Sequence, residues 1–520
     1  MNGQMSGNKK SSVFSKNEHV QELVRISGEL ADIGNAAGLL SWDQETYMPV
    51  KGAEARAKQL ATLAGIYHEK LTSLTVKQLI NQVKKLKKLN IYSAALLREI
   101  GRVYRKENRL PKKLVEELSE VTSRAFDVWQ KAKKESNFAL FEKDLARVVR
   151  LNITAAKLLR EKGQTVYDAM LDDYEHGLTE KEAERVFREV QPKLTALAKK
   201  LSKITAGADS KIANKGYKWE KQWGLGMRII KDMGYDLEAG RQDTSAHPFT
   251  TGFGTGDVRI TTWKNESDLR PALFATIHET GHALYEQGID PRLERAILGG
   301  GTGLAMHESQ SRMWENMVGR SEWFWKKYYP QAQQAFQALQ AVSRQEFVKA
   351  INVVRPSLIR VEADEVTYGL HIIIRFEIEK DLVRGKIKIK DLPKIWNQKY
   401  KELLGVTPKN DREGVLQDVH WSHGLFGYFP TYLLGTMMAA QIFATAQKQI
   451  DVTNLKALRE WLRVNIHQYG KVYSSSELLK RVTGERLNPQ HYIDYLEEKF
   501  AKLYNPQVMN SKVTMMMTSV

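Results

Sequence analysis

Apolar residues recur at helical spacing from Glu18 to about Ser202. Between Leu114 and Trp129 they fall three and four positions apart with charged residues in the gaps, as on a helix with one buried face. The pattern therefore predicts a series of amphipathic helices without a fixed repeat. Proline and glycine interrupt it where helices should end, at Met48-Pro49, Leu110-Pro111 and His176-Gly177.

The pattern changes between Arg241 and Trp263. There Thr, Phe, Val and Ile alternate around closely spaced glycines, which predicts a β-hairpin. Helical spacing resumes at Leu269 and continues to the end of the chain. The β-branched run at 371–379 also suits a buried strand, but residues 365–383 fit a 3.6-residue period over a length that favours a helix. The predicted fold class is mainly α with a small β-sheet or hairpin.

No linker rich in Gly, Ser or Pro divides the chain, which predicts a single domain over residues 18–505. Within it, residues 18–240 form a helical half and residues 241–505 form the half with the candidate chemistry described below. Residues 1–17 and 506–520 are polar and aperiodic, and we expect flexible tails there. A mitochondrial presequence is the weaker alternative for the first tail, which is basic but lacks Arg and an amphipathic period.

The composition limits the possible chemistry. The 520 residues contain no cysteine, which excludes disulfides, thiolate metal sites and cysteine nucleophiles. No apolar run reaches the roughly 18 residues that a membrane span needs. The first residues lack the apolar stretch of a secretory signal. We therefore expect a cytoplasmic protein without a membrane partner.

The chain is basic, with 79 Lys and Arg against 61 Asp and Glu and a formal charge of +18. A nucleic-acid or anionic-surface binder is one interpretation. A Lys-rich helical surface is favoured instead, because clusters such as residues 84–88 alternate with apolar positions and no nucleic-acid-binding motif accompanies them. Specific nucleic-acid binding is therefore not expected.

The segment His278-Glu279-Thr280-Gly281-His282 carries the most information. Residues four apart share a helix face, so both imidazoles can reach one metal ion while Glu279 faces a water bound to it. The alternative is a helix with two hydrogen-bonded histidines. Apolar residues flank the segment, and seven of the twelve histidines lie between residues 247 and 423, which favours a buried metal site.

A catalytic metal needs a third protein ligand and an open position. Glu308, in a helical stretch 26 residues after His282, is the candidate, against the alternative of an ordinary surface carboxylate. The metzincin pattern does not fit, because Tyr285 and Gly288 stand where it requires Gly and His. One divalent ion is expected, with zinc favoured and cobalt or manganese also suited to a His₂Glu site.

Eight ordered motifs between about Leu39 and Phe500 resemble the Taq-type HEXXH metallocarboxypeptidase family. They are LLSWDQETYMP, YDAMLDDYEHG, HPF, DVRITT, HETGHALYEQG, HESQSRMWEN, IRVEADEVTY and GVLQDVHWSHGLFGYFPTYLLG. The resemblance implies a zincin-like helical body with a deep substrate groove, covered by the first half and edged by the small sheet, and assembly as a homodimer. It also implies that His278, His282 and Glu308 bind the metal and that Glu279 is the general base.

Removing a C-terminal residue requires a cation at the terminal carboxylate, and the planar fork of Arg binds carboxylates in a bidentate manner. Arg360 is the candidate to which the family pattern points. The alternative is an ion pair with Glu362, Asp364 or Glu365. Peptides with a free C-terminus and broad specificity are the expected substrates. A peptidyl-dipeptidase, an oligo-endopeptidase and a basic nucleic-acid-binding protein with a vestigial site remain alternatives.

The remaining candidates are polar or aromatic. His420 and Tyr432, with Tyr428 as a further candidate, could donate to the developing oxyanion or could simply pack as aromatic residues. His247 could bind substrate or hold the turn at Pro248. Residues 257–262 would form a strand edge that pairs with a peptide, and Asp364 could orient a ligand imidazole. On that strand the candidate substrate-binding residues are Asp257 and Arg259.

Overall fold

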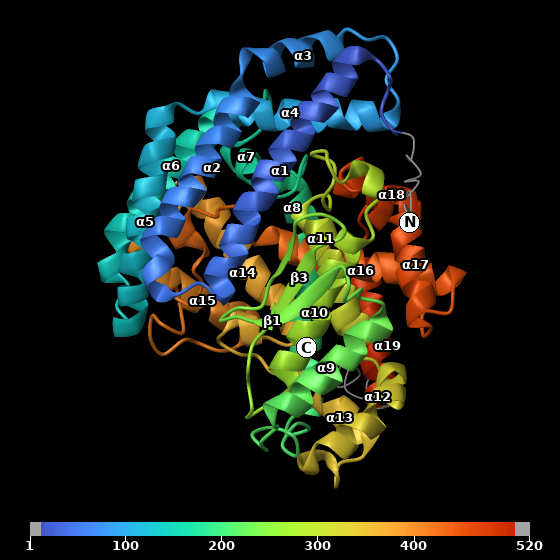
Figure 1. Cartoon of the computed structure of the whole chain (residues 1–520). Coiled ribbons are helices and arrows are strands. Elements are labelled where there is room, and N and C mark those ends of the chain that lie inside the picture. The colour runs from blue at the N-terminus through green and yellow to red at the C-terminus, as the bar shows by residue number, and fades with distance from the viewer. Residues whose placement is uncertain (1–11, 505–520) are drawn as a thin grey trace, which may run out of the picture.

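A computed structural model describes residues 12–504, and helices make up most of the chain (Figure 1). The first group of helices is α1 (Glu18–Thr46), α2 (Ala53–Thr72), α3 (Leu74–Lys84), α4 (Ile91–Arg109), α5 (Lys112–Glu135), α6 (Ala139–Leu159), α7 (Val166–Asp172), α8 (Glu180–Ile204) and α9 (Trp219–Met233). The second group is α10 (Leu269–Gln287), α11 (Leu304–Arg312), α12 (Glu322–Ala335), α13 (Arg344–Ala350), α14 (Thr367–Val383), α15 (Leu392–Leu404), α16 (Pro430–Gln449), α17 (Leu455–Asn465), α18 (Ser475–Thr483) and α19 (Gln490–Tyr504).

The predicted helix breaks are confirmed. Helix α1 ends just before Met48-Pro49, α4 ends before Leu110-Pro111, and α7 ends before His176-Gly177. The amphipathic pattern is also confirmed in α5, where the buried residues Val121, Ala125, Trp129 and Ala132 lie on one face. Mainly helical structure therefore follows directly from the spacing of apolar residues.

The small sheet has three strands, β1 (Gly240–Thr244), β2 (Thr250–Gly252) and β3 (Val258–Thr262), in the order β1-β3-β2. The predicted hairpin is the antiparallel pair β2 and β3, while β1 pairs with β3 in parallel. The expectation that residues 257–262 form a free strand edge is wrong, because β3 lies in the centre. Gly240 makes the unexpected pairing possible, since a Cβ there would lie 2.2 Å from the Val258 carbonyl oxygen.

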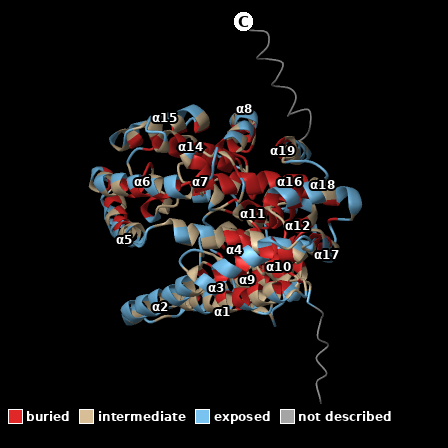
Figure 2. Ribbon diagram, turned by 90° about the horizontal axis from the view of Figure 1, so that it is seen from above, coloured by how far each residue is buried: buried red, intermediate tan, exposed pale blue. Residues whose placement is uncertain are grey.

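The core is built around α10, α11, α14 and α16, whose residues are largely buried (Figure 2). Fourteen residues of α14 are buried, including His371 and the three isoleucines that follow it. The prediction of a helix at 371–379 is therefore confirmed. A helix buried on nearly all sides carries the same apolar run as a buried strand, which explains why that segment was ambiguous.

The predicted tails fall mostly on residues 1–11 and 505–520, which lie outside the described residues. Residues 12–17 are described and pack against the helical body: Phe14 is buried, and the backbone N–H of Ser15 donates to the hydroxyl of Ser93 (2.9 Å). The division of the domain at residue 240 stays a prediction. Within residues 12–504, none of the helices combines the length and the apolar character that crossing a bilayer requires.

Candidate functional site

Helix α10 carries the two candidate imidazoles on one face, one turn apart. Its first turn is capped by Asp268, whose side chain accepts from the N–H of Arg270. The flanking residues Phe274 and Leu284 are buried, as predicted for a metal-site helix, and the side chains of His278 and His282 are only 17% and 16% exposed. The histidines therefore project from a capped and largely buried helix.

Helix α11 brings Glu308 to this pair because two glycines let the helix backbones approach closely. A Cβ on Gly281 of α10 would lie 2.6 Å from Cα of Ser311. On the other side, a Cβ on Gly435 of α16 would lie 2.8 Å from Cβ of Glu308. Neither contact leaves room for a methyl group, so helix α11 is held between α10 and α16 at the position of Glu308.

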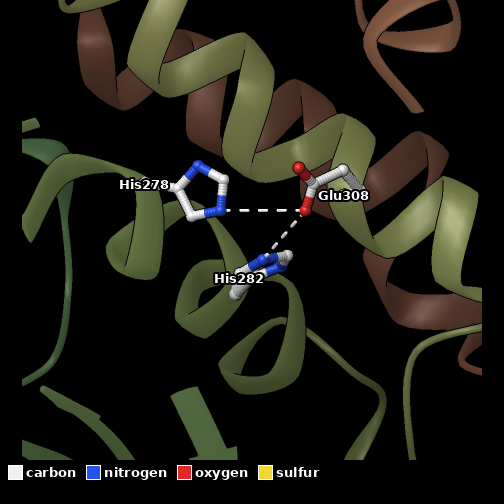
Figure 3. A group of neighbouring side chains, drawn as sticks. All are labelled: His278, His282 and Glu308. Carbon is white, nitrogen blue, oxygen red and sulfur yellow. Dashed lines mark ion pairs between the residues drawn. The ribbon is translucent and has the colours of Figure 1, made fainter. Parts of the chain in front are cut away.

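The three candidate ligands meet at one point (Figure 3). Oε2 of Glu308 lies 3.5 Å from Nε2 of His282 and 3.7 Å from Nε2 of His278, and all three ligand atoms lie within 4.8 Å of one another. Donors at about 2 Å from a tetrahedral zinc ion lie roughly 3.3 Å apart. The donor set therefore fits a divalent ion, and these three residues are the ones that could hold it.

The protonation of His282 and Glu308 suits a metal. Burial lowers the pKa of His282 to about 4, so its ring is neutral near pH 7. Burial alone would raise the pKa of Glu308, but the Arg312 guanidinium and His278 outweigh it and hold that pKa far below its ordinary value. Arg312 donates from Nε to Oε1 of Glu308 (2.6 Å), which leaves Oε2 for the imidazoles. A neutral ring and an ionised carboxylate are the forms that bind metals.

Both imidazoles are hydrogen-bonded through Nδ1, the ring nitrogen that does not face Glu308. Nδ1 of His278 lies 2.9 Å from Oε2 of Glu315, in the π-helical segment η3 (Met313–Val318) that continues α11. Nδ1 of His282 lies 2.6 Å from Nδ1 of His307. Because Nδ1 is occupied in each ring, Nε2 is the atom left to face Glu308. Neither partner was expected from the sequence, although Glu315 stands seven residues after Glu308, at a spacing that shares a helix face.

Asp364 does not orient an imidazole, contrary to the expectation. Its carboxylate accepts from the N–H groups of Arg355, Val366 and Thr367, and from the hydroxyl of Thr367 (2.6 Å). The N–H groups of Val366 and Thr367 lie at the start of α14, where a short acidic side chain satisfies them well, whereas Arg355 belongs to the segment before η5 (Arg360–Glu362). Helix capping therefore explains this residue.

Glu279 is held beside the cluster by β2. The hydroxyl of Thr250 contacts both Oε2 of Glu279 (2.7 Å) and the Glu279 carbonyl oxygen (2.9 Å). Burial raises the pKa of Glu279 above its ordinary value, and His278 opposes this only in part. A carboxylate that is fixed in position and has a raised pKa is suited to moving protons. This role of Thr250 was not expected from the sequence.

His420, Tyr428 and Tyr432 lie together. His420 lies in the short helix η7 (His420–His423), with Nε2 3.4 Å from the Tyr432 hydroxyl. The rings of Tyr428 and Tyr432 are 5.3 Å apart. Burial lowers the pKa of His420 to about 3 and holds the pKa of Tyr432 well above its ordinary value. Both groups are thus neutral near pH 7, and Nδ1 of His420 is buried without a hydrogen-bond partner among the described residues.

Arg360 is buried next to these aromatic residues, with its side chain 7% exposed. It donates from Nε to Asp418 (2.9 Å) and from Nη1 to the Tyr368 hydroxyl (3.2 Å). The ion pair of Arg360 is thus with Asp418 and not with Glu362, Asp364 or Glu365. Asp418 also pairs with Arg375 (2.6 Å), so two buried guanidinium groups share one carboxylate. This leaves an excess of positive charge.

Three predicted substrate-binding residues have other contacts. His247 is exposed, and its carbonyl accepts from the Ser245 hydroxyl (2.6 Å), which favours the turn-holding alternative. Arg259 forms a bidentate ion pair with Asp257 at 2.8 Å for both bonds. The guanidinium of Arg259 also stacks on the Trp42 ring at 4.4 Å. These contacts bind α1 to the sheet and do not join the metal-ligand cluster.

The outer edge of β2 is the strand edge beside Glu279. The Phe249 carbonyl accepts from the N–H of Thr261, and the N–H of Phe253 donates to the carbonyl of Asp257 (both 2.9 Å). In an antiparallel ladder the intervening alternate residues point away, so Thr250 and Gly252 present their N–H and C=O groups outward. Among the described strands, none pairs with this edge.

Comparison with known proteins gives a consistent result. Residues 22–500 match the family described as carboxypeptidase Taq (M32) metallopeptidase. The chain is 39% identical to thermostable carboxypeptidase 1 of Thermus thermophilus, covering 93% of this chain and 98% of the relative. It is 37% identical to thermostable carboxypeptidase 1 of Pyrococcus furiosus, covering 93% of this chain and 99% of the relative. Its structure is similar to that of the M32 carboxypeptidase from Deinococcus radiodurans R1, with a TM-score of 0.89 and 36% identity over 94% of this chain and 99% of that one.

Proposed function

Because the chain belongs to the carboxypeptidase Taq (M32) metallopeptidase family, it is a metal-dependent carboxypeptidase, and we propose that His278, His282 and Glu308 hold its metal. The observation that carries this assignment is the convergence of the three ligand atoms within 4.8 Å. We further propose zinc as the ion, because two imidazoles and one carboxylate are a ligand set of catalytic zinc sites.

Glu279 is the general base in this proposal. The bound metal supplies Lewis acidity to the attacking water and to the scissile carbonyl. The Glu279 carboxylate takes the proton of the water and passes it to the leaving amine nitrogen. Thr250 holds Oε2 of Glu279 in place, and burial raises the pKa of the carboxyl, which makes the proton easier to retain between the two transfers.

Tyr432 and His420 stabilise the oxyanion that develops on the carbonyl. Tyr432 keeps its proton because its pKa is well above the ordinary value, so its hydroxyl can donate to a negative oxygen. His420 is neutral and its Nε2 lies 3.4 Å from that hydroxyl, so it orients Tyr432 or donates beside it. Tyr428, packed against Tyr432, lines the same position.

Arg360 binds the terminal carboxylate of the substrate. Two guanidinium groups around Asp418 leave the site with uncompensated positive charge, which favours an anion. The outer edge of β2 pairs with the extended peptide backbone that leads to the scissile bond. Together these contacts hold a peptide by its main chain and its C-terminus, which supports broad side-chain specificity.

The test uses matched peptides with a free and an amidated C-terminus, incubated with zinc-loaded protein. Release of a single residue from the free form alone is expected. Equal cleavage of both forms would contradict a carboxylate anchor and favour an endopeptidase, and release of dipeptides would favour a peptidyl-dipeptidase. Glu279→Gln is expected to keep its zinc and lose nearly all turnover, and normal turnover of this variant would refute the proton transfers.

A cytoplasmic homodimer completes the proposal. The absence of cysteine supports a reducing compartment. Light scattering coupled to gel filtration is expected to give twice the chain mass of 59.5 kDa. A mass equal to one chain would contradict the dimer without affecting the proposed chemistry.

A further inference from the structure

The Nδ1 atoms of the two candidate metal-binding imidazoles have chemically different hydrogen-bond partners. Nδ1 of His278 faces a carboxylate, Glu315, whereas Nδ1 of His282 faces another imidazole, His307, at 2.6 Å. A carboxylate can only accept a hydrogen bond, so Glu315 dictates where the proton of His278 lies. An imidazole nitrogen can donate or accept. The contact with His307 therefore fixes the His282 tautomer only if something else fixes the tautomer of His307.

Glu286 supplies that constraint. Nε2 of His307 lies 2.7 Å from Oε1 of Glu286. Because the carboxylate can only accept, Nε2 of His307 donates to it, which leaves Nδ1 of His307 to accept from His282. The single proton between the two Nδ1 atoms then belongs to His282. Nε2 of His282 is consequently left without a proton and faces Glu308 at 3.5 Å.

The surrounding structure fixes the position of this chain of hydrogen bonds. The N–H of Gly301 donates to the same Oε1 of Glu286 (2.9 Å). A Cβ on Gly301 would lie 2.6 Å from Cδ2 of His307 and 2.9 Å from Cε1 of Tyr285. The Tyr285 ring packs on His307, with the ring centres 5.1 Å apart. His307 therefore fits its place only because residue 301 has no side chain.

We propose that His307 and Glu286 are positioning residues that fix His282 as the Nδ1–H tautomer and thereby present Nε2 to the metal. The inference rests on the proposed role of His282 as a metal ligand. It also gives a role to Glu286, one helical turn after His282 on the same face of α10. Partners that orient metal-bound imidazoles typically change metal affinity by roughly 10–100-fold when they are removed.

The experiment measures zinc affinity by competition with a chromophoric chelator. His307→Ala is expected to weaken zinc binding by roughly 10–100-fold. His307→Asn is expected to retain most of the affinity, because its Oδ1 can accept from His282 at the position of Nδ1. Gly301→Ala, which pushes His307 away, is expected to weaken binding as His307→Ala does. The control is His68→Ala, which removes an exposed imidazole paired with Glu107.

A second measurement reads the tautomer directly. Nitrogen-15 histidine spectra of the metal-free protein, assigned with His282→Ala, are expected to show the His282 proton on Nδ1. A proton on Nε2 of His282 would overturn the inference, as would wild-type zinc affinity in His307→Ala or equal losses in His307→Ala and His307→Asn. If His282→Ala itself keeps wild-type affinity, the ligand assignment fails instead. Circular dichroism identifies any variant that does not fold, and the spectra of the unaltered protein still decide the question.

Discussion

The buried carboxylate of Glu379 holds η7 and the segment that follows it against α14. Its oxygens accept from Nε1 of Trp421 (2.7 Å), from the Tyr167 hydroxyl (2.9 Å) and from the N–H of Gly427 (3.0 Å). Desolvation outweighs these donors and raises the pKa of Glu379 to about 7. The stability of the protein is therefore expected to depend on the protonation of this group.

The direction in which stability changes with pH follows from proton binding. With a folded-state pKa above the unfolded value, Glu379 contributes stability that is fully present below about pH 4.5 and is lost as the pH rises through about 7. A rise in pKa from 4.5 to about 7 corresponds to roughly 3 kcal/mol. Glu379→Gln cannot titrate. The excess free energy of unfolding of the wild type over this variant is therefore expected to fall by roughly 3 kcal/mol between about pH 5 and pH 8.

Urea unfolding of both proteins across this pH range measures the difference. Glu175, whose pKa burial also raises to about 7, titrates in both proteins and cancels. Glu377→Gln is the matched control on the same helix, because Glu377 is partly exposed and pairs with Lys399 (2.5 Å). It is expected to cost less than about 1 kcal/mol. A difference that stays constant or grows with pH would refute the reasoning, since it would mean that the three donors keep Glu379 ionised throughout.

Three further predictions concern the site. Gly435→Ala is expected to destabilise the protein by about 1–3 kcal/mol and to weaken zinc binding, because its Cβ would meet Glu308 at 2.8 Å. Urea unfolding measures the first effect and chelator competition the second. Unchanged zinc affinity would contradict the role of helix packing. Arg360→Gln is expected to raise KM for free peptides by roughly 10–100-fold, as loss of a charged hydrogen bond does, and the same increase with amidated peptides would contradict a carboxylate anchor. Removal of the metal by a chelator is expected to abolish turnover but not helicity, because Arg312 still pairs with Glu308 (2.6 Å); loss of the helical circular dichroism signal would contradict this.

Local sequence pattern was sufficient to predict the helices and to place the two candidate imidazoles on one helix face. Helix ends depend on neighbouring residues, so the breaks at Pro49 and Pro111 could be predicted from the chain alone. Two histidines four apart on a helix need no tertiary information to share a face. The convergence of Glu308 with them is a long-range contact, and its expectation drew on the resemblance to a family as well as on spacing.

The contacts that the sequence did not predict correctly are those that depend on tertiary packing. Nothing in the alternation of residues 257–262 reveals that β1 occupies the second edge of β3, because parallel pairing joins segments without a hairpin signal. Asp364 and Glu315 are both acidic residues near candidate helices, and spacing does not distinguish the one that caps α14 from the one that holds His278. Only their positions in space separate the two roles.

Two glycines belong both to the local sequence motifs and to the long-range packing of the helices. Gly281 and Gly435 lie inside motifs recognised in the sequence, yet their function is to bring α10 and α16 against α11. A glycine in a helix interior costs roughly 0.5–1 kcal/mol relative to alanine. That cost is offset here by an approach of backbones that no larger residue permits, and the approach is what puts a carboxylate next to two imidazoles. The precision of the candidate site therefore depends on the residues with no side chain as much as on the candidate metal ligands.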